Sequence, residues 1–434
     1  MSWKSDIRED QRLFGWLGGA KLAEYPEREW RKYESTKARE WQNLRKQIAR
    51  AAGETVADQF QAPSYKHSLW SEAGNRTGKV LGNINDYTRD RHPMANELEK
   101  NLEREYLTLV RRQLAGALVT SSGMAALATI WLGLQRAGKL SGTVLIGKES
   151  YFQNQEVVTT AATKVIRFDE LDMDQLAKLL RNENPTVILV DSLCNNPTLT
   201  CPDIIKIAKA IRENSKRKVV LVVDNSLLGM GVGYERLWRE NRGKCQIVVW
   251  ESLNKFFQFG LDRTTGGVIW ADKNGKDGLT YWDLFHARIH AGAIMPDFAC
   301  ALMPRQSAAR MEVYQERINR NAEIIATELK KIVGGRVKQV YRAEREPFAG
   351  AQIVVLLTNN SVWQIQSVIR RAITEAKRRR VQLSAGSSFG LPNTRVYLTA
   401  RKTDFARSFL RISAGCESEP AIREIGEVLK KVLA

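Results

Sequence analysis

A repeated alternation of short apolar segments with longer amphipathic ones limits what this chain can fold into. Between residues 97 and 270, short runs rich in valine and isoleucine are separated by segments with helical periodicity. Strands that are apolar on both faces occur mostly in parallel sheets, which helices cover on both sides. The pattern therefore predicts an α/β fold with a mostly parallel sheet. The segments that we interpret as strands are 117–120, 142–147, 164–168, 186–191, 218–224 and 246–252.

The segments on either side of this region have different patterns. Residues 1–65 are rich in charge and tryptophan, and they contain an amphipathic helical stripe that must pack on the body of the chain or on a neighbouring subunit. After residue 300, a long helix, three strand-like segments and a final helix predict a smaller α+β domain. We therefore predict an N-terminal helical extension (1–65), a large domain (66–300) and a C-terminal α+β domain (301–434). The stripe consists of Trp30, Tyr33, Trp41, Leu44 and Ile48.

Composition argues against several classes of protein. The 434 residues contain no apolar stretch long enough to span a membrane, and the start MSWKSDIREDQR lacks the apolar core of a signal sequence. Five scattered cysteines without a C-x-x-C pair suit a reducing cytoplasm. Four histidines without clustered Cys/His spacing argue against a zinc site. We expect a cytoplasmic protein that binds no metal and no membrane.

The net charge of +19 raises the question of a nucleic-acid partner. The densest basic cluster is RRAITEAKRRR, residues 370–380. It is typical of the solvated end of a helix, where cations also suit the helix dipole. Anionic ligands or a polyanion surface are the other interpretations. The sequence contains no helix-turn-helix or RNA-binding signature, and we do not expect nucleic acid as a partner.

Polar residues that suit an anionic, aldehyde-bearing ligand follow several predicted strands. A strand turns into a helix at SSGMAA, where a glycine exposes backbone N–H groups and the helix N-terminus favours an anion. Asp224 ends one very apolar strand, and Lys255 follows another. Asn196 and Pro197 follow a third. Ligands of parallel sheets gather beyond the carboxyl ends of the strands. The residues concerned are Ser122, Gly123, Met124, Asn196, Asp224 and Lys255.

These segments resemble the cysteine/methionine metabolism family of pyridoxal 5′-phosphate (PLP) enzymes, which includes cystathionine γ-synthase, the cystathionine lyases and methionine γ-lyase. The similarity runs from about Tyr87 to the C-terminus. It implies a fold-type I PLP-dependent transferase, with a mostly parallel seven-stranded sheet in the large domain. The matching segments are YTRDRHP, SSGMAA, NNPTLTCPDI, VVDNS, SLNKFFQFGLD, RINRNAEIIATEL and FLRISAGCE.

The resemblance assigns roles to individual residues. Lys255 would bind the cofactor covalently and then move protons. Asp224 would hold the pyridine nitrogen protonated, and Tyr151 would stack on the ring. Arg411 and Ser384 would bind the substrate, with Arg411 gripping its carboxylate. Residues that would bind other parts of the cofactor are Ser122, Gly123, Met124, Ser252 and Asn254 at the phosphate, Asn196 at the phenolic oxygen, and Tyr87 and Arg89 at the phosphate of a neighbouring subunit.

Without the family pattern, several of these residues have simpler interpretations. Asp224 would serve as a helix cap, Tyr151 as a core aromatic, and Arg411 as a surface arginine on an edge strand. Tyr87 and Arg89 would belong to a polar turn. Their role at a neighbouring site, if correct, implies a homodimer or a homotetramer.

Departures from the family pattern cluster where the substrate is expected. Phe152 and Gln153 replace two small residues, and Asn254 replaces a threonine whose hydroxyl contacts the phosphate. We therefore predict β- or γ-elimination or γ-replacement on a sulfur-containing or O-activated amino acid, with a non-standard substrate of a specialised pathway. The alternatives are another PLP reaction, such as transamination or carbon–carbon bond formation, and a protein that kept the fold only for binding.

Overall fold

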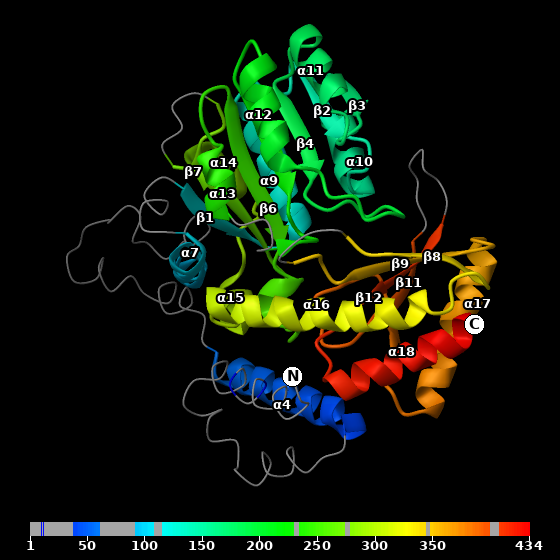
Figure 1. Ribbon diagram of the computed structural model, residues 1–434. Helices are drawn as coiled ribbons and strands as arrows, with labels where there is room; N and C mark the ends of the chain where they lie inside the picture. Colours follow the sequence, from blue (N-terminus) through cyan, green and yellow to red (C-terminus); the bar gives the residue numbers. More distant parts are fainter. Residues whose placement is uncertain are drawn as a thin grey trace, which may run out of the picture.

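The computed structural model describes Asp10, Arg12 and residues 38–60, 92–107, 115–229, 234–273, 278–343, 348–399 and 408–434. Two sheets form separate layers of the molecule (Figure 1). Within these ranges, no helix is both long and apolar enough to cross a membrane.

The larger sheet has seven strands in the order β1-β7-β6-β5-β4-β2-β3. Only β7 runs antiparallel to its neighbours, which confirms the prediction of a mostly parallel sheet. The prediction from apolar runs found six of the strands and missed β7, which brings β1 into the same sheet. The strands are β1 (Ala115–Thr120), β2 (Thr143–Gly147), β3 (Lys164–Phe168), β4 (Val187–Asp191), β5 (Val219–Asp224), β6 (Cys245–Ser252) and β7 (Gly267–Asp272).

Both faces of this sheet are buried, which explains why its strands are apolar throughout. In β5, Val220 and Val222 pack into one apolar cluster, with α9, α10 and α14. Leu221 and Val223 pack into the cluster on the opposite face, with α7, α11 and α12. The elements around the sheet are α7 (Pro93–Tyr106), α9 (Gly123–Arg136), α10 (Phe152–Ala161), α11 (Met173–Asn182), α12 (Ile204–Asn214), α13 (Tyr234–Arg239), η3 (Phe256–Gln258), α14 (Tyr281–His290) and α15 (Asp297–Leu302).

The second sheet has five strands in the order β10-β11-β12-β9-β8. It packs against two C-terminal helices and one half of α16 (Ala308–Lys330), as predicted for an α+β unit. The first half of α16 packs instead into the core of the large sheet, so this helix joins the two layers (Figure 1). The remaining elements are β8 (Val337–Tyr341), β9 (Gln352–Leu357), α17 (Val362–Arg378), β10 (Ser384–Ala385), β11 (Arg395–Thr399), β12 (Phe409–Ser413) and α18 (Glu419–Leu433).

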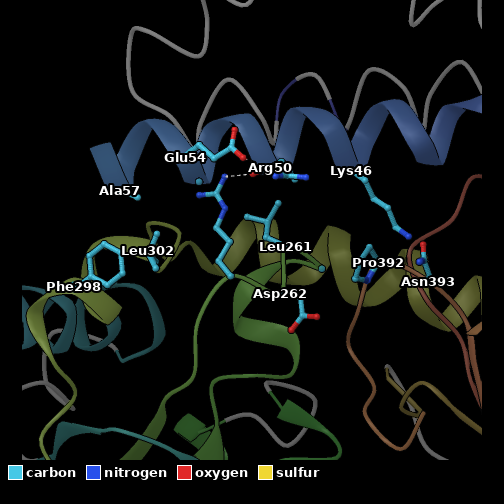
Figure 2. A pocket seen from close by; sticks show the side chains of 14 residues that line it. Lys46, Arg50, Glu54, Ala57, Leu261, Asp262, Phe298, Leu302, Pro392 and Asn393 are labelled. Atoms are coloured by element: carbon cyan, nitrogen blue, oxygen red, sulfur yellow. Dashed lines mark hydrogen bonds and ion pairs between the residues drawn. The ribbon is translucent and has the colours of Figure 1, made fainter. Parts of the chain in front are cut away.

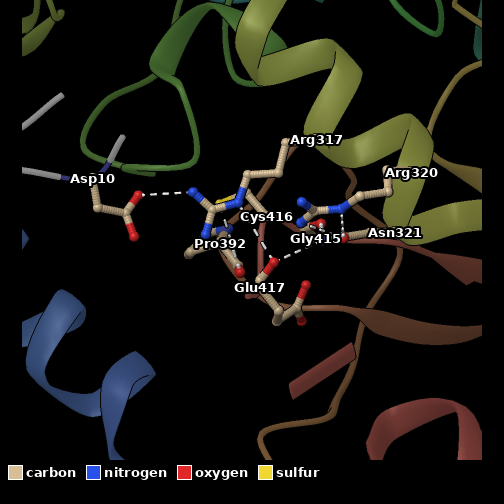
Figure 3. Close-up of polar contacts among 8 residues, drawn as sticks. All are labelled: Asp10, Arg317, Arg320, Asn321, Pro392, Gly415, Cys416 and Glu417. Atoms are coloured by element: carbon tan, nitrogen blue, oxygen red, sulfur yellow. Dashed lines mark hydrogen bonds and ion pairs between the residues drawn. The ribbon is translucent and has the colours of Figure 1, made fainter. Parts of the chain in front are cut away.

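The N-terminal extension contains a long helix, α4 (Ala38–Gln59), that lies alongside α15 and α16 (Figure 1). Ile48 is fully buried, so the helix packs on the body of its own chain. Farther toward the N-terminus, the buried carboxylate of Asp10 pairs with Arg317 of α16 at 3.0 Å (Figure 3). Trp30 and Tyr33 of the predicted stripe lie outside the described residues. The boundaries predicted at residues 65 and 300 stay a prediction.

Candidate active site

A cavity of about 430 Å³ lies beyond the carboxyl ends of the parallel strands, between the large sheet and the second sheet. Parallel sheets bind ligands at this edge because their loops converge there. The structure brings most of the residues that the sequence singled out into the lining of this one cavity. They are Ser122, Gly123, Met124, Tyr151, Asp224, Ser252, Asn254, Lys255 and Arg411.

One side of the cavity is the N-terminus of α9. Ser122 caps this helix, and its Oγ accepts the N–H of Ala125 at 3.1 Å. A Cβ on Gly123 would lie 2.9 Å from the Cβ of Ser252, so only glycine lets the helix approach β6 this closely. The exposed N–H groups and the dipole of α9 favour an anion here, and Ser252 lies beside them.

Asp224 lies at the end of β5, where it forms a buried carboxyl pair with Asp191 of β4. The two residues are register neighbours in the parallel sheet. The Nδ2 of Asn154 donates to Asp224 at 2.9 Å and to Asp191 at 3.5 Å, and the backbone N–H of Ser226 donates to Asp224 at 3.0 Å. Burial raises the pKa of both carboxyls.

The charge of the pair falls on Asp224 for a physical reason. The donors from Asn154 and Ser226 and the positive charge of Lys255 oppose the rise in the pKa of Asp224. Asp191 has a pKa raised well above its ordinary value, by burial and then by the charge of Asp224. Asp191 also accepts the backbone N–H of Tyr151 at 3.0 Å and so positions that tyrosine.

Lys255 follows β6 and begins the turn of η3. Its Nζ donates to Ser388 Oγ at 2.9 Å and lies 4.6 Å from the ring centre of Phe389. Burial, and then the nearby Arg411, lower the pKa of Lys255 to about 8, although Asp224 acts in the opposite direction. An amine with this pKa is neutral in roughly a tenth of the molecules at pH 7, far more often than an ordinary lysine, and only the neutral amine is a nucleophile.

Arg411 lies in β12 with its guanidinium in the cavity. It donates to the Oδ1 of Asn195 at 2.8 Å and to the carbonyl of Ser387. Its buried Nε has no partner among the described residues. The Tyr397 ring lies 5.5 Å from the guanidinium carbon. Burial lowers the pKa of Arg411 to about 10, so it stays charged at neutral pH and can bind a carboxylate.

Two predicted site residues lie elsewhere. Asn196 does not line the cavity, because its side chain closes a turn with Thr200, at 2.8 and 3.0 Å. Its neighbour Asn195 lines the cavity instead. Ser384 lies in β10 outside the lining, whereas Ser388 reaches Lys255. Tyr87 and Arg89 lie outside the described residues.

The sequence analysis also missed residues that the structure brings to the site. Asp191 ends an apolar strand in the same way as Asp224, so the signal that singled out Asp224 was present for Asp191 as well. Asn154 is three residues beyond Tyr151 and carried no signal of its own. Phe389 and Tyr397 come from the second sheet and its loop, far along the chain from the strands that form the opposite wall.

The lining fits PLP. The N-terminus of α9 with Ser252 suits the phosphate, Asp224 suits a protonated pyridine nitrogen, and Lys255 suits the aldehyde. Arg411, with its unpartnered Nε, remains for a substrate carboxylate.

Comparisons with known proteins agree with this assignment. The family described as Cys/Met metabolism PLP-dependent enzymes matches residues 42–353. Cystathionine γ-synthase from Xanthomonas oryzae pv. oryzae is 18% identical, with a TM-score of 0.63 over 82% of this chain and 89% of that one. CalE6, a methionine γ-lyase from Micromonospora echinospora, is 19% identical, with a TM-score of 0.60 over 80% of this chain and 88% of that one.

One curated relative is the bifunctional enzyme flvA of Aspergillus flavus, which is 22% identical over 359 residues. The match covers 80% of this chain but only 42% of the relative, so the chain spans about two fifths of its length. The family match extends over well more than half of the chain and includes every cavity residue that precedes β9. This chain therefore belongs to the PLP-dependent enzymes of cysteine and methionine metabolism.

Proposed function

We propose that this enzyme catalyses β- or γ-elimination or γ-replacement on a sulfur-containing or O-activated amino acid. The observation that carries the proposal is the convergence of Lys255, Asp224, Arg411 and the N-terminus of α9 in one cavity. We also transfer the role proposed for Asn196, a contact with the phenolic oxygen, to Asn195, and that proposed for Ser384 to Ser387 and Ser388.

Each of these residues has a separate role, which follows from its position in the cavity. Arg411 binds the substrate carboxylate and so aligns the Cα–H bond with Lys255. When bound, PLP supplies an electron sink for the pair left at Cα, and the negative charge of Asp224 supports that sink. Lys255, released by the incoming amino group, takes the Cα proton on Nζ and can return it to another carbon. A leaving group at Cγ requires a second proton to be removed, from Cβ, and Lys255 is the base for that step as well.

The shape of the lining supports a substrate other than that of the common family members. Phe152 and Gln153, at the start of α10, both line the cavity where the family pattern has two small residues. Tyr397 lies beside Arg411 and adds another large side chain. We infer that the substrate's side chain is selected by Phe152, Gln153 and Tyr397.

The first test asks whether Lys255 carries the cofactor. The purified protein incubated with PLP should show a visible absorption band that borohydride removes, and mass spectrometry should place the label on the peptide containing Lys255. K255A should show no band. K273A is the matched control, because Lys273 pairs with Glu103 at 3.0 Å and lies outside the cavity lining. A wild-type protein without any borohydride-sensitive adduct would overturn the proposal.

The second test identifies the reaction. A panel of sulfur-containing and O-activated amino acids is incubated with the holoenzyme, with and without a thiol. Ammonia and a keto acid indicate elimination, and a new thioether indicates γ-replacement. Products that arise only from amino-group transfer or from a new carbon–carbon bond would contradict the proposed reaction class.

A further inference from the structure

A second cavity, of about 450 Å³, lies between α4 and the body of the chain (Figure 2). Its roof is one face of α4, and its floor is the segment Gly260–Arg263 with residues of α15 and the loop at Pro392. This volume is in the range of small-molecule sites. None of the residues of this lining belongs to the lining of the active-site cavity.

The roof leaves space because its central side chains are small. Ala49, Gly53 and Ala57 occupy successive turns of the same helix face. A Cβ built on Gly53 would meet nothing within 4 Å. Ala57 lies above Phe298 and Leu302, which makes one end of the cavity apolar (Figure 2).

The charges in this cavity are not balanced. Arg50 is paired with Glu54 at 2.7 Å on the roof. Arg263 rises from the floor, and within the described residues its guanidinium donates only to the carbonyl of Ala49, at the long distance of 3.5 Å. Its Nε is buried without a partner in the part of the chain that the structure describes. Burial alone lowers the pKa of Arg263.

Two cations of the cavity, Arg263 and the exposed Lys46, form no ion pair within the described part of the chain, although the negative charge of Glu417 acts on Lys46 from farther away. Among the residues that the structure describes, no carboxylate lies within ion-pair distance of Arg263 or of Lys46. The adjacent Asp262 points away from α4 (Figure 2). A partly buried guanidinium without an ion-pair partner costs free energy, part of which an incoming anion would recover.

We propose that this cavity is a second binding site, for a small carboxylate with an aliphatic tail. Arg263 would bind the carboxylate in its planar fork, with Lys46 as a further positive charge. Leu261, Phe298 and Leu302 would take the tail. The site is distinct from the one at Arg411, where the proposed amino-acid substrate binds.

The cavity shares two loops with the active site. Gly260 is separated from Lys255 only by η3 and Phe259. Pro392 is two residues beyond Gly390, whose added Cβ would lie 2.6 Å from the backbone carbon of Lys255. Tyr314 of α16 donates to the carbonyl of Gly390 at 3.1 Å and so fixes that loop. A ligand that draws α4 onto these loops therefore changes the surroundings of Lys255.

The test uses full-length holoenzyme and hexanoate as the probe, with hexylammonium and hexanol as probes of the same tail. Isothermal calorimetry should detect hexanoate and neither of the others. R263Q should weaken hexanoate binding by on the order of tenfold or more. G53L should abolish binding by filling the cavity while keeping every charge. K209Q, a charge change at an exposed residue of α12, is the control and should bind as the wild type does.

The variants also separate this site from the active site. Hexanoate held at Arg411 would bind R263Q and G53L as well as wild type, and that result would overturn the proposal. Equal binding of hexanol would overturn the role of the cations. G53L replaces a helical glycine and is expected to fold, since glycine is a poor helix former. Saturating hexanoate should shift the visible absorption of the cofactor in wild type but not in R263Q, and an unchanged wild-type spectrum would overturn the coupling.

Discussion

The chemistry of this site depends on how one negative charge is shared between two neighbouring carboxyl groups. Asp191 and Asp224 face each other across β4 and β5, and Asn154 contacts both. Two buried carboxyl groups on neighbouring strands do not both ionise readily, because the charge of one disfavours the charge of the other. Because Asp224 has the shorter bond from Asn154 and the positive charge of Lys255 nearby, we infer that it keeps the charge proposed to face the pyridine nitrogen, while Asp191 holds Tyr151 in place.

This division predicts opposite results for two matched substitutions. D191N keeps an acceptor for the N–H of Tyr151 and removes no charge, so turnover should change by less than about threefold. D224N removes the counter-charge of the ring nitrogen and should lower turnover by on the order of a hundredfold or more. Steady-state kinetics with the same amino acid, and the pH titration of cofactor absorbance, would measure both. Equal losses in the two variants would contradict the assignment of the charge.

The pKa of Lys255 predicts how cofactor capture depends on pH. Burial and Arg411 lower this pKa from 10.5 to about 8, so the reactive neutral amine is formed as the pH rises through about 8. The rate at which apo-protein captures PLP, followed by stopped-flow absorbance, should rise with pH and level off above about 8. R411Q removes a cation and should move this midpoint upward. A wild-type rate that still climbs steeply at pH 10 would contradict the lowered pKa.

The site residues that sequence reasoning identified are those that follow long apolar strands, because strand ends can be read from composition. Lys255 and Asp224 belong to this group. Composition does not show which side chain of a turn faces the cavity. Asn195 and Asn196 are adjacent and identical, and only the bonds of Asn196 to Thr200 decide which one faces inward.

At the scale of elements, a long strand that is buried on both faces is easier to predict than a short strand whose middle is exposed. β5 is apolar at every position before Asp224, whereas β8, VKQVY, is buried at Val337 and Val340 and exposed between them. Such a short pattern also occurs in loops and helices. The antiparallel β7 was missed although five of its six residues are buried.

Helix α16 holds the loop that follows β12, the strand of Arg411. The Nδ2 of the buried Asn321 donates to the carbonyls of Gly415 and Glu417, at 3.0 and 2.9 Å, directly after β12 (Figure 3). β12 carries Arg411, so these two bonds connect the stability of the helix with the position of the substrate carboxylate.

Asn321→Ala should therefore affect both stability and substrate binding. It should lower the free energy of unfolding by about 1–3 kcal/mol, because the carbonyl of Gly415 loses the Asn321 donor and that of Glu417 keeps the long bond from Arg317 at 3.5 Å. KM should rise more than kcat falls, since the proposed role of Arg411 is to bind the substrate and not to move protons. Urea unfolding and steady-state kinetics measure the two effects. Thr327→Ala, on the exposed side of the same helix, should be close to wild type. Equal stability of the two variants would contradict this role of Asn321.

At the scale of the whole molecule, the densest basic cluster, residues 370–380, contains six cations and one acid, Glu375. On α17, Glu375 pairs with Arg378 and Arg379, and with Lys431 of α18. These contacts lower the pKa of Glu375 and keep it ionised. The cluster at 370–380 lies at the C-terminal end of α17, and two of its six cations pair with Glu375. The absence of a nucleic-acid partner stays a prediction.

The assembly of the enzyme can be tested through the two predicted residues that lie outside the described part of the chain. We propose that Tyr87 and Arg89 reach the phosphate bound in a neighbouring subunit, so that each site needs two chains. K255A and R89A should each be inactive. In a mixed dimer of the two, one site would combine Lys255 of one chain with Arg89 of the other, while the second site would lack both. Because half of the dimers formed at random are mixed, co-expression should restore about a quarter of the wild-type activity. Light scattering would check that both variants form dimers. If they do and co-expression restores no activity, each chain builds its site alone.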